Sequence, residues 1–228
     1  GSDEVTITII GEKRIKVSYG GLDEEADVDG KPLCIYAGEY NDTVTIISGV
    51  KDDNSAIEAD FDIIIDGENG DDTLDMAGAF LSANHFAMIV GGAGCDIIKG
   101  TNGGMTIMFG GSAYVSYEYD EKKIIKGVKK AFSFPDATRI ESNIIFGGVS
   151  SNYIFGGFGA DVIVGGVQDD YIFGDDGRIT FDDDGKFTGF DSQDLYDEGG
   201  ADVIFGLAGN DHIFGGAEND SIDRKSVV

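Results

Sequence analysis

A nine-residue pattern repeats along the chain in a constant frame. In its full form, glycine occupies positions 1, 2 and 4, an acid or amide occupies position 6, and an aliphatic residue occupies position 8. A repeat this short cannot bury a core of its own, so successive copies must stack on one another. The clearest copies are Gly147–Phe155, Gly156–Val164, Gly165–Phe173, Gly206–Phe214 and Gly215–Asp223; Gly91–Lys99 also fits, Gly67–Asp75 nearly fits, and Ala37–Thr45 is a weaker copy.

Each position of the repeat has a physical role. Glycines permit the positive φ angles and the close backbone approach that a tight turn requires. Positions 7 to 9 are expected to form a very short strand whose position-8 side chain points inward. That position is aliphatic in every copy: Val44, Leu74, Ile98, Ile154, Ile163, Ile172, Ile204, Ile213 and Ile222.

Two insertions interrupt the frame without shifting it. Asp161 and Asp202 are 41 residues apart, which equals two repeats and an insertion at about 175–198. A second insertion lies at about 112–142. Stacked repeats accept extra chain in their loops, so the frame continues on either side of both insertions. With the insertions removed, the position-6 residues form two edge ladders: Asn152, Asp170 and Asp211 on one edge, and Asp161, Asp202 and Asp220 on the other.

The frame resembles the GGxGxDxUx nonapeptide of the RTX (repeats-in-toxin) calcium-binding family. The resemblance is specific over residues 144–223, good over 66–99 and looser before residue 66. It implies an all-β fold, a right-handed parallel β-roll or β-solenoid in which two nonapeptides form each turn and calcium ions lie between stacked loops. We expect this roll over 66–223, followed by a tail at 224–228. Residues 1–65 are either a degenerate start of the same solenoid or an N-terminal cap, and the alternation in Val5–Ile9 favours the former.

The aspartates are the main candidates for chemistry. Stacked strands lie about 4.8 Å apart, so equivalent carboxylates on adjacent turns repel each other unless a cation lies between them. Ca²⁺ takes six to eight oxygen ligands, including carboxylates and backbone carbonyls. The candidate ligands are therefore Asp161, Asp170, Asp202, Asp211, Asp220, Asn152, Asp96 and Asp72, with carbonyls of Gly157, Gly159, Gly166 and Gly209. Departures from the frame predict weaker or absent sites at Thr106, Asn143, Asn152, Gln168 and Glu218.

Other acids need no metal. Asp182, Asp183 and Asp184 precede a glycine between Arg178–Phe181 and Phe187–Phe190, which is the pattern of a hairpin turn. Aromatic residues follow the frame as well. Phe109, Phe155, Phe173 and Phe214 are expected to stack on one sheet, with Phe146 and Phe205 on the other, either as an interaction surface or, as we favour, simply packed on each other.

The composition excludes several classes of partner. The chain has 43 acidic and 16 basic residues and a formal net charge of −27, which repels nucleic acids and anionic membranes. No apolar run is long enough for a membrane helix. Cys34 and Cys95 allow at most one disulfide. Neither His85 nor His212 belongs to a recognised catalytic motif, so we expect no enzymatic activity.

The insertion at 112–142 differs from the rest in charge, with six basic and five acidic residues. Its apolar spacing allows either a helix or a hairpin. One interpretation is a flap that lies over the roll; the other is a contact loop for an anionic glycan or an acidic neighbouring subunit. The residues concerned are Lys122, Lys123, Lys126, Lys129, Lys130 and Arg139, flanked by Tyr114, Tyr117, Tyr119, Phe132 and Phe134.

These features predict a calcium-binding structural module of a larger secreted or cell-surface protein, which folds and stiffens in extracellular calcium. The alternative is an adhesive or assembly module of the surface-layer or adhesin type, which contacts a glycan or a neighbouring subunit or associates with itself. An accessory domain of a secreted hydrolase is a third and weaker interpretation.

Overall fold

The computed structural model describes residues 1–119, 125–133, 141–182, 187–192 and 199–223. Every regular element in these residues is a β-strand, which confirms the all-β expectation. The described residues contain no helix long and apolar enough to cross a membrane.

The largest sheet, here the first sheet, has ten strands in the order β21-β19-β15-β13-β9-β7-β5-β1-β2-β3. Its strands pair in parallel from β21 to β1, whereas β2 and β3 continue the sheet as an antiparallel hairpin. The strands are β1 (Glu4–Gly11), β2 (Arg14–Tyr19), β3 (Leu22–Asp27), β5 (Thr43–Ser48), β7 (Thr73–Gly78), β9 (Ile97–Lys99), β13 (Ile144–Phe146), β15 (Val162–Gly166), β19 (Val203–Leu207) and β21 (Ser221–Asp223).

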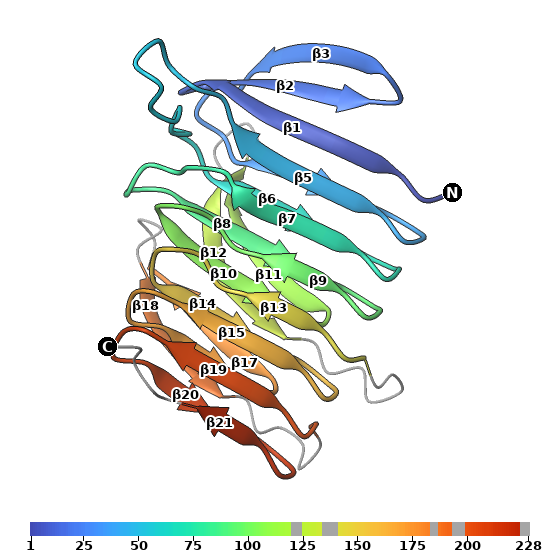
Figure 1. Ribbon diagram of the computed structural model, residues 1–228, viewed down its shortest axis with the longest axis vertical. Coiled ribbons are helices and arrows are strands. Elements are labelled where there is room, and N and C mark those ends of the chain that lie inside the picture. Colours follow the sequence, from blue (N-terminus) through green and yellow to red (C-terminus); the bar gives the residue numbers. More distant parts are fainter. Residues whose placement is uncertain (120–124, 134–140, 183–186, 193–198, 224–228) are drawn as a thin grey trace.

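The second sheet has seven parallel strands in the order β20-β16-β14-β10-β8-β6-β4. They are β4 (Leu33–Tyr36), β6 (Ile63–Asp66), β8 (Phe86–Val90), β10 (Met105–Phe109), β14 (Asn152–Phe155), β16 (Tyr171–Phe173) and β20 (His212–Phe214). From β4 onward the chain alternates between the two sheets, apart from the insertions, so it winds as a coil along the length of the molecule (Figure 1). This arrangement is consistent with a parallel β-roll.

The core lies between the two sheets and is formed by the inward position-8 side chains. Ile163 is paired with Ile145 and Ile204 in the first sheet, and Ile172 with Ile154 and Ile213 in the second. All the predicted inward residues are buried except Ile222, on the last strand, which is 37% exposed. Because each strand is short, the core is built along the coil rather than within any one turn.

The insertions fold together into a third sheet, the insertion sheet. It consists of β11 (Ala113–Tyr119), β12 (Ile125–Ser133), β17 (Gly177–Phe181) and β18 (Phe187–Ser192) in that order. The insertion at 112–142 is therefore a hairpin, and β17 pairs with β18 as predicted. The pairing of β12 with β17 joins the two insertions, which the sequence did not predict. Lys122, Lys123, Phe134, Arg139, Asp183, Asp184 and the tail 224–228 lie outside the described residues, as do the side chains of Tyr119, Lys126 and Lys129.

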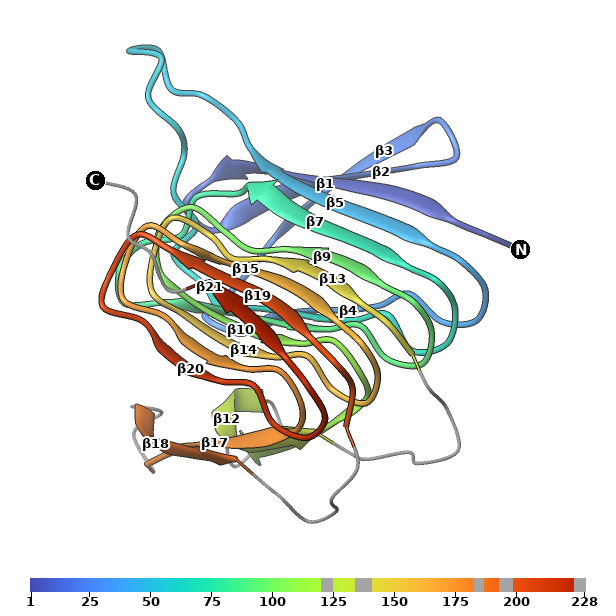
Figure 2. The same ribbon diagram turned by 60° about the horizontal axis from the view of Figure 1, so that its bottom comes forward.

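The insertion sheet covers the outer face of the second sheet (Figure 2). Ala131, Ile179 and Phe181 are buried against the aromatic residues of that face. The predicted aromatic column is present, with ring centroids 4.8 Å apart for Phe109 and Phe155 and 5.1 Å apart for Phe155 and Phe173. Most of the column is thus packed under the insertion sheet, as expected of a flap.

The two cysteines lie apart and both are free thiols. Cys34 is on β4, whereas Cys95 is exposed in the loop between β8 and β9. The single disulfide that the sequence allowed does not form.

Candidate metal site

The loops that lead from the second sheet to the first form one edge of the molecule, here the first edge. Along it, the backbone N–H of each position-6 residue donates a hydrogen bond to the side-chain Oδ1 of the next turn. Asp161 donates to Asp202 over 2.8 Å, and Asp202 donates to Asp220 over 3.0 Å. The complete ladder runs through Asp3, Asp42, Asp72, Asp96, Asn143, Asp161, Asp202 and Asp220.

Glycine shapes the loop that presents each carboxylate. Gly157 and Gly159, at positions 2 and 4, have φ angles of 96° and 133°, which L side chains rarely adopt. Gly156, at position 1, serves a different purpose, because a Cβ there would lie 2.6 Å from Asp161 Oδ2 and against the carbonyl of Gly174. The glycine therefore leaves room for two oxygen atoms that approach each other from adjacent turns.

The second carboxylate oxygen of the ladder is the unusual feature. Five Oδ2 atoms are fully buried and, within the described part of the chain, make no hydrogen bond; they belong to Asp42, Asp72, Asp96, Asp161 and Asp202. Each of these residues is at most 3% exposed. A buried carboxylate oxygen without a partner is costly, so it calls for a proton or a cation.

The electrostatics of the ladder agree with this geometry. Burial, reinforced by the neighbouring carboxylates, raises the pKa of Asp161 to about 9 and that of Asp202 to about 7. The same causes raise the pKa of Asp96 to about 7 and that of Asp72 to about 6. The folded chain on its own therefore disfavours the charged form of these carboxylates.

The loops from the first sheet to the second form the second edge, and its carboxylates are better satisfied. Asn152 donates to Asp170 Oδ1 from both its backbone N and its Nδ2 over 2.8 Å, and Gly166 N donates to Asp170 Oδ2 over 2.5 Å. Asp170 N donates in turn to Asp211 Oδ1 over 3.1 Å. Burial raises the pKa of Asp170 to about 6 and that of Asp211 above its ordinary value.

The N-terminal part of the second edge has a different chemistry. His85 Nδ1 and Nε2 lie 2.9 Å from Asp62 and 3.2 Å from Asp60. Further along, the hydroxyls of Thr101 and Thr106 are 2.8 Å apart. Among the residues that the structure describes, only the first edge thus has the ladder of Oδ1 hydrogen bonds throughout, an asymmetry that the repeat alone does not predict.

The predicted glycine ligands occupy both edges. Gly157 and Gly159 lie at the first edge, while Gly209, with φ 129°, lies at the second. Ala208 N donates to the Gly166 carbonyl over 3.3 Å, so that carbonyl already has a partner. Glu218 replaces a position-4 glycine yet keeps a positive φ of 63°, so its loop retains the shape of its neighbours.

Sequence reasoning missed two carboxylates of the first edge, Asp175 and Asp42. Asp175, assigned to an insertion, accepts hydrogen bonds from Gly200 N over 3.0 Å and Ala217 N over 2.6 Å. Its charge contributes to the raised pKa values of Asp161 and Asp202. Asp175 stands at a position-2 site where the repeat has glycine, so the frame gave no signal for it. Asp42, by contrast, was detectable, because it holds position 6 of the weaker copy Ala37–Thr45.

The donor set suits a hard cation. Among the described residues, no three His, Cys, Asp or Glu side chains gather around one point. A cation at this edge would therefore need backbone carbonyls as well as carboxylates, which is the mixed oxygen set that Ca²⁺ accepts. The approach of Asp161 Oδ2 and the Gly174 carbonyl shows that the loops bring both kinds of oxygen together.

The model of the RTX calcium-binding nonapeptide repeat matches the chain over residues 142–178 and 188–223, in four copies. The chain therefore carries RTX repeats, as the sequence indicated. No curated protein matches the chain. The matched residues contain the predicted pairs Asp161/Asp202, Asp202/Asp220 and Asp170/Asp211, whereas Asp72 and Asp96 lie outside the match.

Proposed function

We propose that this chain is a calcium-binding structural module of a larger secreted or cell-surface RTX-type protein, a right-handed β-roll that folds and stiffens when it binds calcium. The proposal rests above all on the five buried Oδ2 atoms of the first edge, which the described protein groups leave without a hydrogen bond. The RTX repeats supply the identity of the cation.

Asp161, Asp202 and Asp220 would hold ions at the first edge together with loop carbonyls, and Asp175 would add a carboxylate there. Asp170 and Asp211 would serve the second edge. The bound ion would supply positive charge to carboxylates that burial otherwise disfavours. With a dissociation constant near 10⁻⁴ M, each site contributes about 1.4 kcal/mol at about 1 mM calcium. Six such sites give about 8 kcal/mol, which is comparable with the stability of a whole domain.

A calcium titration followed by far-ultraviolet circular dichroism tests this proposal. We expect the strand signal and the melting temperature to rise together as calcium is added and to fall when EDTA removes it. Magnesium at the same concentration serves as a control, because its strict octahedral geometry and tightly held waters suit these loops poorly. A melting temperature that EDTA leaves unchanged would refute the proposal.

A second candidate function, an adhesive or assembly module, has one observation in its favour. Paired residues on an antiparallel sheet share a face, so Tyr114 and Phe132 lie opposite the buried Ala131, on the outer face of the insertion sheet. Their ring centroids are 5.0 Å apart, and Lys130 Nζ lies 5.6 Å from the Phe132 ring centroid. Exposed aromatic rings beside a cation suit an anionic glycan or an acidic subunit.

The variants Tyr114→Ala and Lys130→Ala distinguish this function from the structural one. If the insertion sheet is a contact surface, both variants fold and bind calcium normally but lose retention on a glycan array or lose self-association. If it is only a cover, neither variant changes any binding property. Deletion of the whole insertion is less informative, because Ala131 and its neighbours are part of the core.

We also propose that the chain has no catalytic role of its own, including in the setting of a secreted hydrolase. His85 is held between two aspartates, and the ring of His212 stacks on Tyr171 with centroids 4.7 Å apart. Both arrangements support structural roles for the histidines. Hydrolysis of ester, peptide or glycoside substrates by the purified chain, abolished by His85→Ala, would overturn this view.

A further inference from the structure

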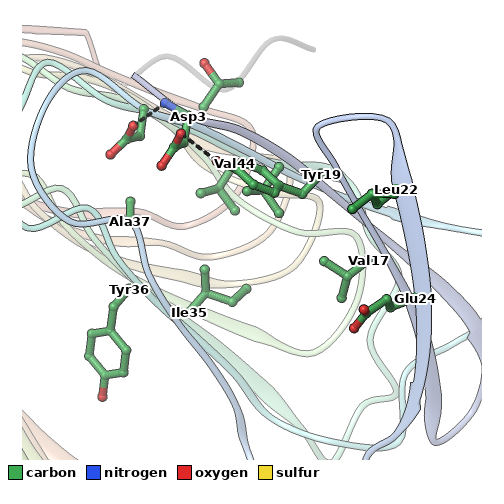
Figure 3. Close-up of a pocket in the computed structure, with 12 residues that line it drawn as sticks. Asp3, Val17, Tyr19, Leu22, Glu24, Ile35, Tyr36, Ala37 and Val44 are labelled. Atoms are coloured by element: carbon green, nitrogen blue, oxygen red, sulfur yellow. Dashed lines mark hydrogen bonds between the residues drawn. The ribbon is translucent and has the colours of Figure 1, made fainter. Parts of the chain in front are cut away.

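The N-terminal end of the coil contains a cavity of about 520 Å³ that lies away from the RTX repeats. The β2–β3 hairpin forms one wall, and β4 with the start of β5 forms the other (Figure 3). Val5, Val17, Ile35 and Val44 give it an apolar lining. Its volume falls within the range of ligand sites in proteins.

The rim of this cavity is unusually apolar for an acidic protein. Leu22 is 72% exposed, the highest value among the large hydrophobic residues of the described chain, and Tyr19 and Tyr36 are 50% and 56% exposed. All three line the cavity. Clusters of exposed hydrophobic residues are rare on the surface of a monomer and often mark an interaction site.

The charge of the cavity has one sign. Asp3, Glu24 and Asp42 line it, and none of the described residues that line it is basic. Asp42 is 3% exposed, and its Oδ2 is one of the buried atoms without a hydrogen bond. Elsewhere on the hairpin the acids are neutralised, because Arg14 pairs with Glu25 and Lys16 pairs with Asp23. A ligand with a positive charge and an apolar body complements this surface.

The wall formed by β4 also offers backbone groups. This strand ends the second sheet, and no strand of the described part of the chain pairs with its other side. Leu33 N and Ala37 N donate to Asp62 and Asp66 on the β6 side, so the alternate backbone groups of β4 face the open side. In the first sheet the corresponding position is already filled, because β2 pairs with β1. One sheet is thus closed at this end and the other is open.

We infer that this cavity binds an extended peptide strand with alternating basic and apolar side chains, which pairs with β4 and places its basic side chains under the β2–β3 hairpin. Their aliphatic stems would lie on the apolar lining and their charged ends would reach Asp3 and Glu24, whereas the apolar side chains would lie on the opposite face of the second sheet, beside Cys34. Addition of a strand to an open sheet edge is a recurrent mode of peptide recognition. A second copy of this chain is a poor occupant, because its net charge is −27. Its last strand, β21, also ends with Asp223 and directly follows Asp220.

Fluorescence anisotropy with a labelled Val-Lys-Val-Lys-Val peptide, blocked at both ends, tests the inference on the full chain in about 1 mM calcium. We expect saturable binding with one peptide per chain. The matched Val-Glu-Val-Glu-Val peptide should bind at least about tenfold more weakly, since its charges oppose those of the cavity. N-methylation of one alternate set of peptide amides should abolish binding and N-methylation of the other set should not, because only one set of N–H groups faces β4.

Two matched variants locate the site. Glu24→Lys reverses a charge that lines the cavity, whereas Glu25→Lys makes the same change in net charge on a residue that pairs with Arg14 and is absent from the lining. We expect Glu24→Lys to weaken binding of the basic peptide by about tenfold and Glu25→Lys by less than about twofold. Val17→Trp, which fills the cavity, should abolish binding while calcium binding persists.

Several results would overturn the inference. Equal affinity for the acidic and basic peptides, or equal effects of the Glu24 and Glu25 variants, would show non-specific attraction to an acidic protein. Hexylamine that competes as well as the peptide would identify a small-molecule pocket instead. Self-association that Val17→Trp abolishes would identify a second copy as the occupant. The site lies outside the RTX repeats, so failure of peptide binding leaves the calcium proposal standing.

Discussion

Replacement of Asp202 by asparagine should change stability with opposite signs in the presence and absence of calcium. The chain already contains a precedent for this change, because Asn143 occupies the same ladder two turns away. Its Oδ1 accepts from Asp96 N over 2.8 Å, and its Nδ2 donates to the Gly156 carbonyl over 3.3 Å. Asp202→Asn therefore keeps the ladder and removes only the buried charge.

The magnitudes follow from the pKa and from mass action. The pKa of Asp202 rises from 3.8 to about 7 on folding. That difference corresponds to an upper limit of roughly 4 kcal/mol at pH 8, and we take about half of it, because the metal-free edge can relax and admit water around the buried charge. In EDTA the variant should therefore be about 2 kcal/mol more stable than the parent. In about 1 mM calcium it loses two adjoining sites, about 3 kcal/mol together, and becomes about 1 kcal/mol less stable.

Urea denaturation in EDTA and in calcium at pH 8 measures both free energies of unfolding. Asp52→Asn is the matched control, because Asp52 is exposed in a loop between β5 and β6 and the charge change is the same. The control should alter stability by less than about 0.5 kcal/mol in either condition. If Asp202→Asn destabilises the protein equally in EDTA and in calcium, then protein contacts and not a cation hold the carboxylate, and the reasoning is wrong.

Three further predictions follow from the same geometry. Burial raises the pKa of Asp161 to about 9 and that of Asp96 to about 7, so the metal-free fold gains stability as pH falls and loses it as pH rises through 7 to 9. Thermal melts in EDTA from pH 5 to 9 should show this slope, and a flat profile would contradict it. Gly156→Ala should cost more than about 3 kcal/mol, because its Cβ would meet Asp161 and Gly174, whereas Gly111→Ala, with its nearest contact at 3.9 Å, should cost far less; equal melting temperatures would refute this. Phe181→Ala should cost about 3 kcal/mol, because Phe181 is 8% exposed and its ring centroid is 5.9 Å from that of Phe86; a change below about 0.5 kcal/mol in urea denaturation would show that the insertion sheet is only loosely attached.

The sequence predicted those features that repeat with a fixed period. A nine-residue period fixes which side chain points inward, so Ile163 and Ile172 were placed in the core correctly. The same period placed Asp161 and Asp202 on one edge and Asp170 and Asp211 on the other, where the structure puts them. Whether these residues bind metal stays a prediction.

Features that depend on contacts between non-repeating segments could not be predicted from the sequence. The pairing of β12 with β17 joins insertions that are separated by four strands of the coil, and neither insertion alone indicates a partner. The carboxylate of Asp175 accepts hydrogen bonds from Gly200 N and Ala217 N, which lie 25 and 42 residues further along the chain, so no single repeat indicates these contacts. The sequence analysis also expected only repulsion between stacked carboxylates. It did not predict that each Oδ1 accepts a hydrogen bond from a backbone N–H of the adjacent turn.

That last point explains why the two oxygens of one carboxylate have different roles. Oδ1 fixes the spacing between turns through the N–H of the adjacent turn, and this contact does not require metal. Oδ2 has no such donor in Asp161 and Asp202, so its charge is left for a cation to neutralise. In Asp170 both oxygens have donors, from Asn152 and Gly166, so the protein itself supplies part of what calcium would supply elsewhere. We therefore expect the first edge to depend on calcium more strongly than the second, although their carboxylates occupy the same position of the repeat.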